Sequence, residues 1–178
     1  MRKVLFVLGQ LSDSDMEWII GVGSRHSVRA GDIVICEGRD IDMVYLVLDG
    51  KLSVLERGDL EIARLGCGEI VGEMSFVDGR PPSATVRALT DSVLFAIPRR
   101  ALASKLEADQ GFAARFYRAL AVFLSQRLRD TVQHLGYGSG VALEEDVDYS
   151  DELNPAVLDT VHLAGARFDR MLKRLMSR

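Results

Sequence analysis

The sequence predicts a mainly β fold with flanking helices, built as a sandwich or jelly roll. Between residues 24 and 97, short runs rich in Val, Ile and Leu alternate with glycine-containing turns, which is typical of many short strands. From 111 to 135, apolar residues recur every three or four positions and predict one long helix. The 178 residues are 48% hydrophobic and 27% charged, as in a globular chain that needs no metal or disulfide staple.

The β region is expected to follow a short helix near the N-terminus. Ser12 and Ser14 can cap this helix, and Gly21 and Gly23 end it. Asp49-Gly50 is a strong signal for a hairpin turn between two of the strands that follow. The expected strands lie near 28 and over 33–36, 44–48, 52–54, 61–65, 85–88 and 93–97.

Helices are expected to dominate the second half of the chain. Pro98 closes the β region and suits the start of a helix over 99–107, and Asp109 can cap the long helix. That long helix would measure roughly 37 Å, more than a lid over one small roll requires. The expected domain division is a β domain with its N-terminal and second helices at 1–110, a long helix at 111–135, a Gly-rich and acidic linker at 136–154, and a last amphipathic helix at 155–178.

Charge and composition exclude several classes of protein. The net charge of −4 gives no overall attraction for nucleic acid. No apolar run approaches the ~18 residues of a membrane span, and the N-terminal run is shorter than the ~7–15 residues of a signal-peptide core. Cys36 and Cys67 fit reduced thiols of a cytoplasmic protein. His26, His134 and His162 lack the spacing of metal ligands, which argues against a metal-dependent jelly-roll enzyme.

The stretch 70–87 carries the strongest chemical signal in the chain. A Gly72-Glu73 turn precedes a short apolar helix and a second glycine turn, and small hydroxyl residues then enter a strand. Glycine lets the backbone approach a ligand, and the amides at the start of the short helix, 73–76, point toward an anion. Ser83 and Thr85 can donate hydrogen bonds, and Glu73 can accept them from a sugar hydroxyl. The pattern therefore indicates an anion-binding site.

At these residues the sequence resembles the cyclic nucleotide-binding domain family, over about residues 11 to 135. The resemblance also rests on Arg29-Ala-Gly-Asp32, Glu37-Gly38, Tyr45-Leu-Val-Leu-Asp-Gly50 and Gly66-Cys-Gly-Glu69, and on the order helix, β domain, two helices. It implies a β-roll, a double-stranded β-helix or jelly roll, that holds cyclic AMP or cyclic GMP in a phosphate-binding cassette. It also implies that the long C-terminal lid helix covers the base and often forms dimers.

The resemblance implies roles for the first half of the cassette. Gly72 and Glu73 match the family's Gly-Glu pair, in which the glutamate holds the ribose 2′-hydroxyl. Met74 and Ser75 match positions whose backbone amides face the phosphate and the ribose. Thr131, on the long helix, lies near the position where family members contact the base; a solvent-facing threonine is the alternative.

The second half of the cassette departs from the family at one position. Ser83 matches the small or hydroxyl residue beside the phosphate, and Ala84 and Thr85 match the next two positions. The family's phosphate-neutralising arginine, however, is replaced by Pro82. Such a charged hydrogen bond contributes roughly 1.5–3 kcal/mol, or about ten- to a hundredfold in affinity. Arg80 could swing in to replace it, although the two prolines after it stiffen the chain.

The sequence thus indicates a cytoplasmic, bacterial regulatory module rather than an enzyme. Only one helix and an acidic linker follow Leu135, which is less than a DNA-reading unit needs, so no DNA partner is expected and no membrane partner either. A ligand in the cassette would shift the lid helix between positions. The long helix favours a homodimer through 111–135, and 155–178 would dock on its own roll or on a protein partner.

Two hypotheses remain open. One is a sensor for a cyclic nucleotide or another small anionic ligand, in which Glu73, Arg80 and Ser83 do the binding. The other is a protein-interaction or oligomerisation module with a degenerate pocket, which Pro82 favours. Neither requires a cofactor or a metal.

Overall fold

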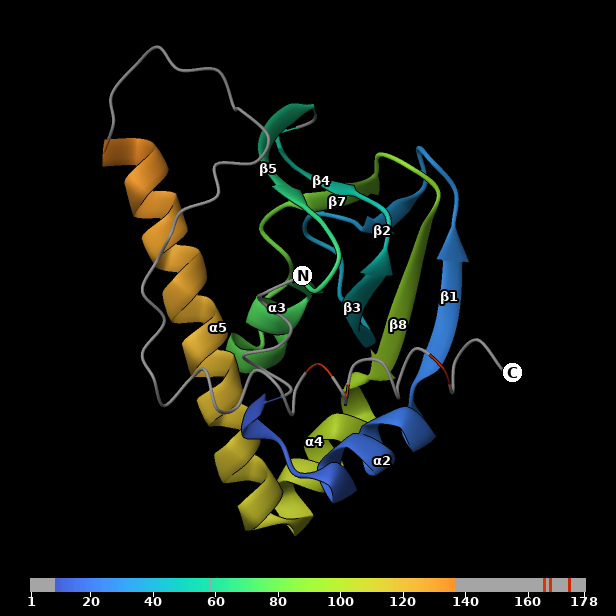
Figure 1. Ribbon diagram of the computed structural model, residues 1–178. Helices are drawn as coiled ribbons and strands as arrows, with labels where there is room; N and C mark the ends of the chain where they lie inside the picture. The colour runs from blue at the N-terminus through green and yellow to red at the C-terminus, as the bar shows by residue number, and fades with distance from the viewer. Residues whose placement is uncertain (1–8, 58, 137–164, 166, 168–172, 174–178) are drawn as a thin grey trace.

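The computed structural model describes residues 9–57, 59–136, 165, 167 and 173 (Figure 1). The N-terminal run 1–8 lies outside the described residues. So do nearly all of the linker expected over 136–154 and of the helix expected over 155–178.

Within the described residues, two four-stranded antiparallel sheets form a β-roll, which confirms the mainly β fold with flanking helices. The first sheet has the order β1-β8-β3-β6, with bounds Ser24–Val28, Ser92–Pro98, Met43–Asp49 and Ile70–Val71. The second has the order β2-β7-β4-β5, with bounds Ile33–Ile35, Thr85–Ala88, Leu52–Glu56 and Leu60–Leu65.

The central strands of the first sheet, β3 and β8, are buried on both faces. Val47 and Leu94 point between the sheets, whereas their neighbours Leu46 and Phe95 pack beneath the helices. Strands buried on both faces have no solvent side, so 43–49 reads as a nearly continuous apolar run rather than an alternating one.

Helix α2, Asp13–Val22, begins and ends as the residue types predict, with one shift. Ser12 caps it through a capping box: its side chain accepts from the Asp15 amide, and the Asp15 carboxylate accepts from the Ser12 amide. Gly21 lies inside the helix and Gly23 ends it. A Cβ at position 23 would lie 2.1 Å from the Phe95 ring, so glycine also allows the close packing of this turn.

Three further helices frame the site: α3, Glu73–Asp78; α4, Arg99–Ala108; and α5, Gln110–Gly136. Helix α5 extends the predicted 111–135 by one residue at each end, and Asp109 caps it by accepting from the Phe112 amide at 2.9 Å. Figure 1 shows α2 and α4 below the roll and α5 running up its side past α3. Phe112 is fully buried where α5 meets α2 and α4.

The prediction of a hairpin at Asp49-Gly50 is wrong. β3 pairs with β6 and β8 in one sheet, whereas β4 pairs with β5 and β7 in the other. The turn therefore carries the chain from sheet to sheet. Gly50 has φ 96°, and a Cβ there would lie 2.1 Å from Ser92 Oγ. The same residue pair suits any tight turn with positive φ, so the dipeptide alone cannot distinguish a hairpin from a crossover.

Candidate functional site

The turn between β6 and α3 is built on glycine. Gly72 has φ 85° and ψ 1°, a left-handed conformation that side chains disfavour. A Cβ at this position would lie 2.7 Å from Ile41 Cδ1 and 3.2 Å from the Met43 carbonyl oxygen. The turn therefore needs glycine for two reasons, and it places Glu73 at the first position of α3.

Glu73 is only 3% exposed, although it is a carboxylate. The backbone amides of Glu73 and Met74 donate to it, and Arg127 Nη1 donates to its Oε1 at 2.5 Å. Burial raises the pKa of the Glu73 carboxyl, and Arg127 opposes that rise. The amides at the start of α3, which were expected to face an anion, thus meet the protein's own carboxylate.

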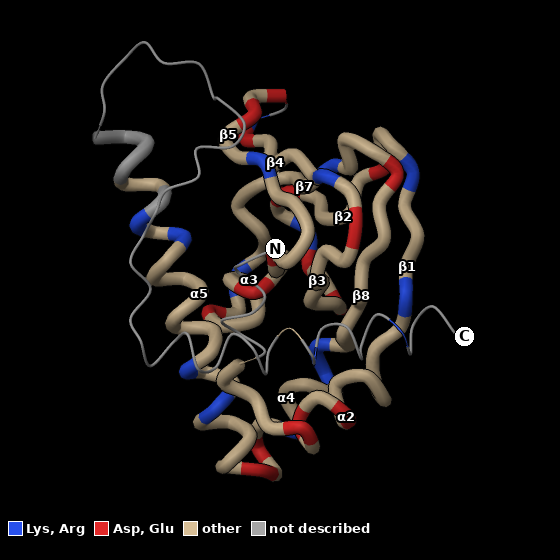
Figure 2. The backbone as a smooth tube through the Cα atoms, in the orientation of Figure 1, with Lys and Arg blue, Asp and Glu red and all other residues tan. Residues whose placement is uncertain are grey.

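Arg127 on α5 is the site residue that sequence reasoning missed. Its Nη2 also donates to Glu69 Oε2 at 3.2 Å and to the Ile70 carbonyl at 3.1 Å, and its guanidinium lies 4.8 Å from the centre of the Phe123 ring. Figure 2 shows that basic positions recur along α5 and that the neighbouring α3 carries acidic positions. Two buried carboxylates therefore share one arginine.

The sequence did contain a signal for Arg127. Phe116, Leu120, Phe123 and Arg127 follow one another at steps of four, three and four, so the arginine occupies a position on the apolar stripe of α5. A charge at such a position needs an acidic partner when the helix packs. Which carboxylate would supply it could not be read from spacing, because Glu73 lies 54 positions away.

Glu69 is the last residue of the motif Gly66-Cys-Gly-Glu69. It is 7% exposed. Its backbone is fixed to the roll, because its carbonyl accepts from the Val47 amide at 2.9 Å and its amide donates to the Gly66 carbonyl at 3.1 Å. Glu69 therefore offers a second carboxylate to Arg127 from a rigid turn.

The second half of the cassette is tied to the loop after β2. The Pro82 carbonyl accepts from the Gly38 amide at 2.8 Å, and Thr85 Oγ1 accepts from the Glu37 amide at 3.1 Å. Ser83 is exposed and Ala84 is half-buried. Both hydrogen bonds bring the Glu37-Gly38 motif against the cassette, so these two sequence motifs form one surface.

Arg80 does not replace the missing family arginine in this structure. It is exposed, its backbone amide donates to Asp78 Oδ1 at 3.0 Å, and its guanidinium has no hydrogen-bond partner among the described residues.

The remaining candidates divide between buried and exposed positions. Met74 is 57% exposed, whereas Ser75 is buried, and the Ser75 carbonyl accepts from Arg99 Nη2 at 2.8 Å. Arg99 Nη1 also donates to the Ile41 carbonyl, so one arginine fixes α3 to the loop before β3. Thr131 is exposed and donates to the Arg127 carbonyl within its own helix.

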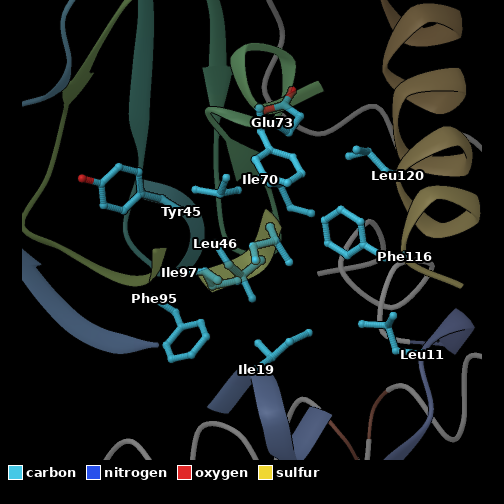
Figure 3. A pocket seen from close by; sticks show the side chains of 13 residues that line it. Leu11, Ile19, Tyr45, Leu46, Ile70, Glu73, Phe95, Ile97, Phe116 and Leu120 are labelled. Carbon is cyan, nitrogen blue, oxygen red and sulfur yellow. The ribbon is translucent and has the colours of Figure 1, made fainter. Parts of the chain in front are cut away.

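An apolar cavity of about 50 Å³ lies under α5 (Figure 3). Phe116 and Leu120 reach into it from α5 and Ile19 from α2, while Glu73 is the one charged residue among the described residues that line it. Pockets for small molecules measure roughly 300–1,000 Å³. This cavity is therefore a packing gap beneath the helix and not a nucleotide pocket.

The described part of the chain contains neither a membrane-spanning helix nor a cluster of metal ligands. No helix in it combines the length and hydrophobicity that crossing a membrane requires. The described residues also include no group of three or more His, Cys, Asp or Glu that could hold a metal ion.

Comparison with known proteins agrees with the fold. Residues 25–109 match the family model described as the cyclic nucleotide-binding domain. A crystal structure of a cyclic nucleotide-binding domain from Methylobacillus flagellatus covers 80% of this chain and 85% of its own, with a TM-score of 0.69 and 22% identity. The family model matches residues 25–109, and the solved structure shows that the fold is that of a cyclic nucleotide-binding domain.

Other relatives are larger proteins. The lysophospholipase nte1 of Aspergillus terreus is 32% identical over 125 residues, which are 68% of this chain and 8% of that protein. The regulatory subunit of a cAMP-independent protein kinase A from Trypanosoma brucei has a TM-score of 0.59 and 20% identity, and the match covers 73% of this chain and 44% of that one. The chain spans less than a tenth of the length of the fungal relative.

Proposed function

We propose that this protein is a regulatory sensor module that binds cyclic AMP or cyclic GMP in the cassette and signals by repositioning α5. The observation that carries the proposal is the Gly72 turn, which buries Glu73 at the start of α3 inside a roll of this family. The family fold is regulatory rather than catalytic, so the proposal includes no enzymatic role. It also includes a cytoplasmic location and no DNA partner.

In this proposal, each cassette residue contacts a different part of the nucleotide. Glu73 accepts a hydrogen bond from the ribose 2′-hydroxyl. The backbone amides of Met74 and Ser75 are assigned to the ribose and the phosphate, and the Met74 amide would then exchange its present bond to the Glu73 carboxylate for one to the ligand. Ser83, Ala84 and Thr85 line the phosphate, and Thr131 approaches the base. Arg80 is the nearest basic residue in the cassette sequence, and it is free to turn toward the phosphate.

The missing cassette arginine makes the proposed binding weak. With Pro82 in its place, roughly ten- to a hundredfold in affinity is lost unless Arg80 compensates. Arg127 does not supply the missing charge, because its guanidinium is held by Glu73 and Glu69. We therefore expect a dissociation constant well above that of a family member with the arginine.

Signal output in this proposal passes through α5. Leu128 and Val132 are 64% and 57% exposed, and a second copy of the helix would cover them in a homodimer through 111–135. A ligand that shifts the end of α5 would then change the contacts between the two copies.

A degenerate-pocket interaction module is the second candidate. Two observations favour it: Pro82 stands where the family has its phosphate-binding arginine, and Arg127 already pairs with Glu73, the carboxylate that the sensor proposal assigns to the ribose. In that case 155–178 provides the contact with a protein partner, or docks on its own domain. Arg167 donates to Asp13 Oδ1 at 2.7 Å, which supports docking against α2. Deleting 155–178 would then break the partner complex, and nucleotides would have no effect.

A thermal-shift titration with cyclic AMP and cyclic GMP to millimolar concentration tests the sensor proposal. At a hundred times its dissociation constant a ligand stabilises the fold by about 2.7 kcal/mol, which raises the Tm by several degrees in a chain of this size. We expect a saturable shift in the wild type, and its loss in Glu73→Ala and in the milder Glu73→Gln. Glu107→Ala, which removes an exposed glutamate from α4, is the matched control. No shift with either nucleotide would favour the interaction module instead.

A further inference from the structure

Helix α3 is too short to hold its position by itself. It has six residues, Glu73–Asp78, whereas isolated helices shorter than about 12–15 residues are marginal in water. Two of its apolar side chains, Met74 and Val77, are more than half exposed, so they add little packing. The position of α3 therefore depends on contacts with neighbouring elements, although its first residues carry the groups that the proposed function assigns to the nucleotide.

One of these contacts comes from Arg99, the first residue of α4. Its Nη2 donates to the Ser75 carbonyl at 2.8 Å, and its Nη1 donates to the Ile41 carbonyl at 3.1 Å. Its backbone amide donates to the Asp42 carbonyl at 2.8 Å. Among the described residues the guanidinium has no carboxylate partner, so both of its hydrogen bonds go to the backbone. One side chain thus joins α4, α3 and the loop before β3.

Both acceptors of the Arg99 guanidinium lie beside the turn into α3. The Ser75 carbonyl belongs to the last turn of α3, which has no basic residue of its own, and a cation is favourable at that end of a helix. Ile41 packs against the turn itself, since a Cβ on Gly72 would lie 2.7 Å from its Cδ1. Arg99 therefore fixes the end of α3 and also the residue that packs against its start.

We propose that Arg99 is a positioning residue of the cassette, which holds α3 against the loop before β3 so that the site is formed before a ligand arrives. It bonds the Ser75 carbonyl and not the Ser75 amide that is assigned to the ligand, so it acts without touching the nucleotide. A site already in its binding geometry loses less conformational freedom on binding. The hold on α3 is a property of the ligand-free protein, whereas its effect on affinity rests on the proposed function.

The first measurement uses no nucleotide. Hydrogen–deuterium exchange in the full chain compares the wild type with Arg99→Ala and with Arg100→Ala, which removes the exposed arginine at the next position of α4. Losing a charged hydrogen-bonded contact speeds local opening by about ten- to a hundredfold. We expect the amides of 76–79 to exchange at least about tenfold faster in Arg99→Ala only, with 93–97 of β8 unchanged. Equal exchange in Arg99→Ala and Arg100→Ala would overturn the proposal.

Two further variants separate positioning from a general loss of stability. Leu106→Ala opens a cavity beneath the far end of α4 but removes no hydrogen bond to α3. Because α3 opens locally, its exchange should stay within about twofold of the wild type in Leu106→Ala. Exchange as fast as in Arg99→Ala would overturn the positioning role.

The second variant is conservative. Arg99→Lys keeps the charge but cannot donate to two carbonyls through one planar fork. We expect exchange in α3 to lie between those of the wild type and Arg99→Ala. If Arg99→Ala is poorly folded by circular dichroism, the Lys variant decides, and wild-type exchange in it would overturn the proposal.

The second measurement is cyclic AMP affinity by calorimetry. We expect Arg99→Ala to bind several-fold more weakly than the wild type, and Arg99→Lys to lie between them, whereas Arg100→Ala and Leu106→Ala bind as the wild type does. Wild-type affinity in an Arg99→Ala protein whose α3 exchanges faster would overturn the effect on binding. If the wild type binds neither cyclic AMP nor cyclic GMP, the proposed function and the effect on binding fail together, while the exchange experiment still decides whether Arg99 holds α3.

Discussion

Gly72 and Gly79 bracket α3 and show what a single residue contributes. Both have positive φ, 85° and 70°, but their surroundings differ. A Cβ at Gly72 would meet Ile41 and the Met43 carbonyl, whereas a Cβ at Gly79 would meet nothing within 4 Å. The two positions therefore separate backbone strain from steric exclusion.

We expect Gly72→Ala to destabilise the fold by about 2–4 kcal/mol and Gly79→Ala by about 1 kcal/mol. The first substitution adds a clash to the cost of the left-handed backbone, and the second adds the backbone cost alone. Urea unfolding of the two variants measures the difference. Equal losses would mean that the Ile41 side chain relaxes freely and that the turn has more space than its contacts indicate.

The two halves of helix α5 differ in how deeply their apolar residues are buried. Its first half packs through Phe112, Ala119, Leu120 and Phe123, all buried, whereas its second half carries exposed apolar residues. The apolar stripe of an isolated sequence cannot distinguish these halves, because both have the same periodicity. Only the extent of the roll beside the helix decides where packing stops.

If α5 forms the homodimer, charges on its exposed stripe should dissociate it. We expect the double variant Leu128→Glu, Val132→Glu to change a dimer into a monomer in light scattering, because two carboxylates would be buried at the interface. Its Tm measured at low concentration should change little, since both side chains are exposed in the single chain. Arg118→Glu, on the exposed face of the first half, is the control. A wild type that is monomeric at high micromolar concentration would contradict the dimer.

At the scale of the whole molecule, α2 joins distant parts of the chain. Arg115 donates to Asp15 across 100 positions, and Arg167 donates to Asp13 across 154. Burial raises the pKa of Asp15, but the hydrogen bonds from Arg115 and Ser12 outweigh it and lower the pKa from 3.8 to about 2. Folding therefore depends on the ionised form of Asp15.

This link predicts a specific loss of stability in acid. Between pH 4 and pH 2, Asp15 is protonated in the unfolded chain but stays ionised in the folded protein. The free energy of unfolding therefore falls as the pH drops through this window, whereas above pH 4 the ionised Asp15 contributes its full stabilisation. At pH 7, Asp15→Asn should lower the free energy of unfolding by about 1–2 kcal/mol, a value reduced because Arg115 is partly exposed. On acidification, the stability of this variant should fall less than that of the wild type.

Urea unfolding at pH 7, 4, 3 and 2.5 measures both effects. Asp40→Asn, at an exposed position of the loop before β3, controls for the loss of one negative charge. If the free energies of unfolding of the wild type and Asp15→Asn fell in parallel with pH, ionised Asp15 would not be the source of the acid sensitivity.

The sequence by itself determined the fold class and the order of the elements. These depend on local chemistry: glycine where φ is positive, caps at helix starts, and the period of the apolar residues. Ser12 and Asp109 cap helices, and Gly72 adopts a positive φ, so the local backbone alone favours the residue type at each of these positions.

Only the tertiary structure decided which charges meet and which turns join which sheets. Asp49-Gly50 marks a turn in either topology, and the pairing of β3 and β4 with separate sheets makes it a crossover. Arg127 stands out on its stripe, but its partners Glu73 and Glu69 come from positions 54 and 58 residues away. Such pairs form because folding brings distant segments together and buried charges must then be compensated, a requirement that no local pattern expresses.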